Sequence, residues 1–169
     1  MKSNWMNCTL PSKLDTYNVL ILYASIHHQN TKKTVRRIAD HLNATVISVL
    51  DEPVLDIALY DLVIFASGIY CNHAHKKLIE WIKHLPLKEK KTMFLYTCGL
   101  RYLNYEKEVK QLLIERKSDY VGSVYCRGYD TYGLLRYVGG IAKGHPNEKD
   151  MHKMINKIDR LLLASTNDR

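Results

Sequence analysis

The segment YASIHHQNTKKTV, residues 23–35, joins an apolar run to a polar stretch with helical character. The apolar run, Val19–Leu22, predicts a buried strand. Apolar residues at helical spacing then predict an amphipathic helix over Thr31–Leu42. Only small, polar and imidazole side chains lie between the two. Such a direct passage from strand to helix is typical of the first unit of an α/β protein.

The alternation of apolar runs and amphipathic segments continues along the chain. Short apolar or β-branched runs predict strands that are covered on both faces, at Val19–Tyr23, Thr45–Leu50, Leu62–Ala66, Thr92–Tyr96 and Tyr120–Cys126. Helical spacing predicts helices at Thr31–Leu42, Ala74–Leu85, Tyr105–Lys117 and near Glu148–Leu163. Residues 51–61 fit only a short or imperfect helix. We therefore predict a three-layer α/β fold, a doubly wound five-stranded parallel sheet with right-handed crossovers.

The length of 169 residues is enough for the core of one mid-sized domain. We expect an N-terminal extension over residues 1–17 and a single domain over residues 18–165. No apolar stretch approaches the length of a membrane span, and the first residues lack the apolar core of a secretory signal. The sequence predicts a cytoplasmic protein without a membrane span.

The charged, cysteine and histidine residues limit which partners and which metal or dithiol sites the sequence predicts. Lys and Arg total 25 against 17 Asp and Glu, and the net charge of +8 favours acidic partners. We expect no nucleic-acid partner, because neither a groove-reading motif nor a basic face with stacking aromatics is evident. The four cysteines form no C-x-x-C pair, which argues against a zinc or dithiol motif. His73 and His75 bring no further ligand at suitable spacing, so no metal site is expected.

The loop after the first predicted strand has the chemistry of an anion site. In doubly wound sheets ligands bind beyond the carboxyl ends of the strands, and this loop usually forms one wall of the crevice. Ser25, Asn30 and Thr31 offer hydroxyl and amide donors, and the first N–H groups of the following helix point outward. A phosphate suits these groups, although the same residue types also serve as plain helix caps. Neither glycine motif of nucleotide-binding loops is present, which disfavours a nucleoside triphosphate or NAD.

Two more predicted strands end in small residues. Ser67 and Gly68 follow the third strand, with Tyr70 close behind, and the triplet TCG, residues 97–99, follows the fourth. A glycine at such a position permits a close approach of the backbone to a ligand. Three successive strand ends therefore carry similar chemistry at one edge of the sheet.

These segments together, YASIHHQNT, DLVIFASGIY, FLYTCGL and GYDTYG…GGIAKGHPNEKD, resemble the flavodoxin family over roughly residues 19–162, most closely its short bacterial members. The resemblance implies a flavodoxin-like fold that binds FMN without a covalent bond and uses it for redox chemistry. It implies a phosphate loop of Ser25, His27, His28, Gln29, Asn30 and Thr31, a loop along the isoalloxazine of Ser67, Gly68, Ile69 and Tyr70, and a loop near the pyrimidine edge of Thr97, Cys98 and Gly99. Asp130 and Thr131 are further candidates for contact with the flavin or a substrate.

Physical roles follow for some of these residues. Backbone N–H groups of the second and third loops would bond the polar edge of the ring. Tyr70 would stack on the ring face. Cys98 is interpreted as a packing residue rather than a redox thiol.

The sequence departs from the family pattern in its phosphate loop and in its charge. Gln29 stands where the family usually has glycine, and a side chain resists positive φ. His27 or His28 could donate to the phosphate and make its binding depend on pH. Flavodoxins that serve as low-potential shuttles are typically acidic. Here Lys76, Lys77, Arg101 and Arg127 are predicted near the crevice, where positive charge would favour the reduced, anionic flavin and a less negative midpoint potential.

Three functions are compatible with the sequence. The leading hypothesis is FMN-dependent electron transfer or oxidoreduction with a redox partner protein or a small-molecule electron acceptor, and two chains could form a homodimer. The segment ASGIYCNHAHKKLIEWIKHL also resembles flavodoxin-like protoporphyrinogen oxidases. The third hypothesis, kept open by Gln29, is a flavodoxin-like module that has lost FMN and only binds a partner. The long connection over residues 127–146 either walls the flavin edge, receives a partner or packs on itself.

Overall fold

The computed structural model describes residues 17–52 and 54–167, so the predicted extension lies almost wholly outside the described residues. The strands and α-helices within them are β1 Val19–Ala24, α1 Asn30–Leu42, β2 Thr45–Ser48, β3 Leu62–Tyr70, β4 His73–Ala74, α2 Lys76–His84, β5 Lys91–Cys98, α3 Glu106–Glu115, β6 Asp119–Arg127 and α4 Glu148–Asn167. Short 3₁₀ helices lie at η2 Val49–Asp51, η3 Ile57–Leu59 and η4 Gly133–Val138.

The predicted parallel sheet is confirmed, with strand order β2-β1-β3-β5-β6. Ile64 in the central strand β3 lies opposite Ile21 of β1 on one side and Met93 of β5 on the other. The order changes direction between β1 and β3, because the chain moves outward to β2 before it returns to the far side of β1. Ligands of doubly wound sheets bind at the carboxyl end of this switch point.

The sheet also contains a sixth strand that was not predicted. β4 pairs antiparallel with the end of β3, where Tyr70 lies opposite His73. The predicted end of the third strand before Ser67 and Gly68 is therefore wrong, because both residues belong to β3. The chain turns instead at Cys71 and Asn72, which have φ of 48° and 72°. This hairpin carries the third strand past its predicted end at Ala66.

The observed boundaries of β2 and α2 also differ from the predicted ones, and a side-chain cap explains each difference. β2 ends at Ser48 rather than Leu50, because the Ser48 hydroxyl accepts the N–H of Leu50 at 3.2 Å and starts η2. α2 begins at Lys76 rather than Ala74, because the imidazole of His75 caps it by accepting the N–H of Lys77 at 3.2 Å. Residues 51–61 contain the end of η2 and all of η3, in place of the expected imperfect α-helix.

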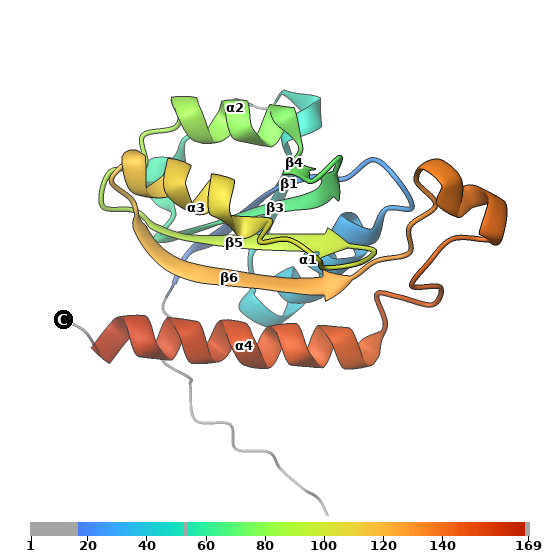
Figure 1. The fold of residues 1–169 in the computed structure, drawn as a ribbon. Helices are drawn as coiled ribbons and strands as arrows, with labels where there is room; N and C mark the ends of the chain where they lie inside the picture. Colours follow the sequence, from blue (N-terminus) through green and yellow to red (C-terminus); the bar gives the residue numbers. More distant parts are fainter. Residues whose placement is uncertain (1–16, 53, 168–169) are drawn as a thin grey trace, which may run out of the picture.

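Two apolar layers hold the helices against the sheet (Figure 1). α2 and α3 cover one face, and α1 and α4 cover the other. Successive side chains of a strand point to opposite faces. In β1, Leu22 therefore packs in the layer of α2 and α3, and Ile21 packs in the layer of α1 and α4, both fully buried. The sheet is thus a rigid platform that exposes its carboxyl edge.

The edge strand β6 needs a glycine where it meets α4. The β5–β6 register shifts by one residue between Thr92 and Met93, and Gly122 follows this bulge with φ of 148°. A Cβ at Gly122 would lie 3.1 Å from the side chain of Leu161 in α4. Both the backbone conformation and the packing of α4 therefore exclude a larger residue here.

We predict that Gly122→Ala lowers the free energy of unfolding by about 1–3 kcal/mol, because the new methyl group adds a contact with Leu161 to a strained backbone. Urea unfolding followed by circular dichroism measures the change. Gly133→Ala is the control, since Gly133 has φ of 60° but no heavy atom within 4 Å of an added Cβ. Equal losses in the two variants would show that packing against Leu161 contributes nothing.

Candidate functional site

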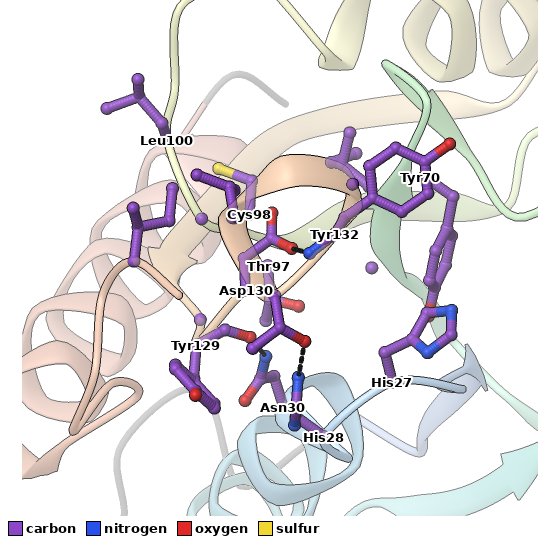
Figure 2. A pocket seen from close by; sticks show the side chains of 18 of the residues that line it. His27, His28, Asn30, Tyr70, Thr97, Cys98, Leu100, Tyr129, Asp130 and Tyr132 are labelled. Carbon is purple, nitrogen blue, oxygen red and sulfur yellow. Dashed lines mark hydrogen bonds between the residues drawn. The ribbon is translucent and has the colours of Figure 1, made fainter. Parts of the chain in front are cut away.

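The carboxyl ends of β1, β3, β5 and β6 open onto a cavity of about 1020 Å³ (Figure 2). Most of the residues predicted to bind a cofactor line it: His27, His28, Asn30, Thr31, Gly68, Ile69, Tyr70, Thr97, Cys98, Gly99 and Asp130. Ser25, Gln29 and Ser67 lie outside its lining. The topology therefore gathers the three predicted loops and Asp130 around one space.

The first loop turns from β1 into α1 through two residues in the left-handed region. His28 and Gln29 both have φ of 53°, a conformation that costs a residue with a Cβ about 1–2 kcal/mol. The side-chain amide of Gln29 donates to the carbonyl of Ile26 at 3.1 Å, and the Ser25 hydroxyl accepts the N–H of Lys32 at 3.3 Å. Gln29 thus adopts the backbone that glycine usually supplies, and Ser25 and Gln29 shape the loop from outside the cavity.

The start of α1 is tied to the connection between β6 and α4 (Figure 2). The Asn30 side chain donates to the carbonyl of Tyr129 at 2.8 Å, and His28 and Thr131 share a hydrogen bond of 2.7 Å. Gly128 leaves the room for this contact, because a Cβ there would lie 2.7 Å from the Asn30 amide nitrogen. This connection between β6 and α4, the fourth loop of the cavity, is therefore held against the first loop and forms a wall of the cavity.

Ser67 supports the second loop from inside the protein. It is fully buried, and its hydroxyl donates to the carbonyl of Gly68 at 2.6 Å and accepts the N–H of His75 at 2.9 Å. These bonds fix the β3–β4 hairpin. Ser67 thus sets the position of the cavity residues Gly68 and Tyr70 without facing the cavity itself.

Tyr70 reaches from the second loop to the first. Its hydroxyl accepts the backbone N–H of Ile26 at 3.0 Å. Its ring lies near the imidazoles of His27 and His75, with centroid distances of 5.8 and 5.7 Å. Burial raises the pKa of Tyr70, so the hydroxyl remains protonated and neutral at physiological pH.

The third loop meets the first and the fourth. Thr97 and Thr31, both buried, share a hydrogen bond of 2.9 Å that joins β5 to the start of α1. A Cβ at Gly99 would lie 2.6 Å from the Cβ of Asp130, so only glycine allows the fourth loop this close approach. Burial raises the pKa of Cys98 to about 11, which keeps the thiol protonated and agrees with its interpretation as a packing residue.

Positive charge acts on the cavity from the side of the third and fourth loops. Arg101 and Arg127 both lower the pKa of Cys98 against the larger effect of its burial. Arg127 donates to the carbonyl of Gly99 at 3.4 Å, and Arg136 belongs to the cavity lining. Lys77 does not contribute to this field as expected, because it forms an ion pair with Glu52.

The histidines considered as metal ligands have other partners. His73 bonds to Glu108 at 3.1 Å, and His75 caps α2. Within residues 17–52 and 54–167, no three His, Cys, Asp or Glu side chains are grouped so that they could hold a metal ion. No helix in that part of the chain is both long and apolar enough to span a membrane.

The sequence analysis did not name the cavity residues of the β5–α3 loop, which are Leu100, Tyr102 and Tyr105. The connection after β6, for which a wall of the flavin edge was one of the expected roles, adds to the lining the candidate Thr131 and also Tyr129, Tyr132, Leu134, Leu135, Arg136, Tyr137 and Ile141. Its sequence signal was aromatic and apolar content beside glycines: η4 carries Leu134 and Tyr137 but has no buried residue. The ribbon places this connection beyond the carboxyl edge of the sheet (Figure 1).

Comparisons with known proteins agree with this geometry. Residues 13–133 match the family described as flavodoxin domain. An uncharacterized protein of Methanocaldococcus jannaschii is 38% identical over 136 residues, which cover 79% of this chain and 91% of the relative.

Solved structures show the same fold at low sequence identity. Oxidised flavodoxin 2 from Bacillus cereus is similar with a TM-score of 0.61 and 17% identity, covering 88% of this chain and 99% of that one. The two-electron reduced flavodoxin of Megasphaera elsdenii has a TM-score of 0.59 and 17% identity, covering 82% and 98%. The family match spans well over half of the sequence and confirms the resemblance carried by the strand-end loops. The chain belongs to the flavodoxin domain family.

Proposed function

We propose that this protein binds FMN without a covalent bond in the cavity at the carboxyl edge of the sheet and acts in electron transfer or oxidoreduction. The observation that carries the proposal is the convergence of three strand-end loops of a flavodoxin-domain chain on one cavity. Its volume of about 1020 Å³ lies at the upper end of the range for small-molecule sites, about 300–1,000 Å³, and has room for a flavin.

The donors at the start of α1 fit a phosphate group. The first N–H groups of a helix have no intrahelical acceptor and carry the positive end of its dipole. No Lys or Arg lines this side of the cavity, where the polar side chains are those of His27, His28, Asn30 and Thr31. These residues and the backbone N–H groups of the loop would hold the phosphate through hydrogen bonds, without a Lys or Arg side chain.

The second and third loops fit the ring system. Gly68 and Gly99 belong to the cavity lining, where Tyr70 and Asp130 pack against them, and Tyr70 supplies an aromatic face. When bound, the flavin accepts and donates electrons, and the protein supplies binding, orientation and electrostatics. Asp130 lies beside Gly99, where its carboxylate can accept a hydrogen bond from the polar edge of the ring. The connection over residues 128–141 would shield the ring from water.

The electron partner fits the charge of the protein. With a net charge of +8 and arginines beside the cavity, an acidic redox protein or an anionic small-molecule acceptor is favoured. The domain is proposed to span residues 18–165, in the cytoplasm, and association into a homodimer is part of the same proposal. Gln29 in its left-handed conformation supports retained FMN binding over a module that has lost it.

We expect the purified protein, alone or after addition of FMN, to show the visible absorption of an oxidised flavin, with one FMN released per chain on denaturation. Absorption spectroscopy followed by chromatography of the released cofactor measures both. A colourless protein that takes up no added FMN would contradict the proposal.

Gln29→Val should weaken FMN binding by about tenfold, because a β-branched residue resists the left-handed backbone that the phosphate loop requires. Gln29→Gly is the matched control and should bind FMN at least as tightly as the wild type. Quenching of flavin fluorescence gives the dissociation constants. Equal affinity in the valine and glycine variants would show that the conformation of this residue does not matter for binding.

Removing the positive charges beside the cavity should make the midpoint potential of the bound flavin more negative. For Arg101→Ala combined with Arg127→Ala we expect a shift on the order of 20–60 mV per charge, because both guanidinium groups favour negative charge at the cavity. Spectroelectrochemical titration measures the potential. Arg37→Ala is the control, because it removes one positive charge from a residue that pairs with Glu148 and lies outside the cavity lining. A shift of the midpoint potential per charge as large as that of the double variant would contradict this effect.

A further inference from the structure

The Tyr70 hydroxyl lies on the side of the cavity that is proposed to hold the phosphate. It accepts the N–H of Ile26 at 3.0 Å. This N–H group belongs to the loop that enters α1, and in the proposed function this loop holds the phosphate of FMN. The phenolic oxygen therefore occupies a position that a phosphate oxygen would take in the proposed function.

The ring of Tyr70 is held in this position by a fitted surrounding. His27 lies on one side at 5.8 Å and His75 contacts the ring edge-on at 5.7 Å, measured between centroids. Gly68 lies beneath the hydroxyl, because a Cβ added there would come within 2.8 Å of the Tyr70 oxygen. A side chain at residue 68 would thus push Tyr70 out of the loop.

The same pose covers two parts of the proposed flavin site. The hydroxyl engages the phosphate loop, and the ring lies against Gly68, where the backbone would otherwise approach the isoalloxazine. A ligand that uses the N–H group of Ile26 must first displace Tyr70. The apparent affinity of every such ligand is reduced by the fraction of molecules in which Tyr70 closes the loop.

We propose that Tyr70 determines specificity in the proposed FMN site by closing the phosphate loop against inorganic phosphate and simple phosphate esters while yielding to FMN. This inference rests on the proposed function. Inorganic phosphate displaces the tyrosine and gives its ring no new partner. FMN offers the displaced ring an isoalloxazine surface, and such an aromatic stack contributes roughly a two- to tenfold gain in affinity.

The test compares inorganic phosphate with FMN on four proteins: wild type, Tyr70→Phe, Tyr70→Ala and the control Tyr60→Phe. Tyr60 directly precedes Asp61 and β3 and lies outside the cavity lining. Calorimetry measures phosphate binding, and quenching of flavin fluorescence measures FMN binding. Thermal melts verify that each variant is folded.

Tyr70→Phe should bind inorganic phosphate about tenfold more tightly than the wild type, because the hydroxyl no longer competes for the N–H of Ile26. It keeps the ring and should bind FMN at least as tightly as the wild type. Tyr70→Ala should also gain phosphate affinity but lose several-fold in FMN affinity, because the stacking ring is missing. The ratio of FMN to phosphate affinity therefore falls in the alanine variant, and Tyr60→Phe leaves both affinities unchanged.

Unchanged phosphate affinity in both Tyr70 variants, with FMN bound by the wild type, would overturn this inference and leave the proposed function intact. Absence of FMN binding in the wild type and in every variant would overturn the proposed function and, with it, the specificity for FMN. If the alanine variant does not fold, NMR titration of ¹⁵N-labelled wild type and Tyr70→Phe with inorganic phosphate tests the predicted gain in phosphate affinity. The inference requires the amide resonance of Ile26 to shift at a lower phosphate concentration in the phenylalanine variant than in the wild type.

Discussion

The N–H groups at the start of α1 need acceptors that the helix itself cannot supply, and the cavity is organised around that need. One of the preceding loop N–H groups, that of Ile26, is accepted by the hydroxyl of Tyr70. The left-handed residues His28 and Gln29 determine the direction from which the chain enters the helix. A loop with unpaired donors aimed outward binds anions without any basic side chain. The chemistry of the site thus begins with backbone geometry.

Contacts between the loops transmit this geometry to the rest of the cavity. Asn30 positions the connection after β6 through the carbonyl of Tyr129, and Thr31 reaches the end of β5 through Thr97. The glycines at 99 and 128 are required because neighbouring loops pass too close for a side chain. A change at the start of α1 therefore affects the wall formed by residues 128–141 as well as the phosphate side.

Much of this arrangement could be predicted from the sequence, and the failures have physical causes. The doubly wound parallel sheet follows from apolar runs that alternate with amphipathic helices, and the resemblance of the loops to the family identified many of the cavity residues. The β3–β4 hairpin was missed because its turn at Cys71 and Asn72 uses positive φ without glycine. The direction of the Ser67 hydroxyl, toward His75, depends on that hairpin and could not be predicted without it. Lys77 pairs with Glu52, a contact between segments that no local pattern reveals.

The hydrogen-bond donors at the start of α1 and the positively charged arginines lie on different sides of the cavity. The start of α1 contributes polar side chains but no Lys or Arg to the cavity lining, whereas Arg101 and Arg136 belong to the third and fourth loops and Arg127 ends β6. Within the described residues, none of these three guanidinium groups lies within 4.0 Å of a carboxylate oxygen. Arg101 and Arg136 instead lie over the rings of Tyr125 and Tyr137. Their charge is therefore not cancelled by a direct ion pair, so in the proposed function it would act on the bound ring independently of how the phosphate is held.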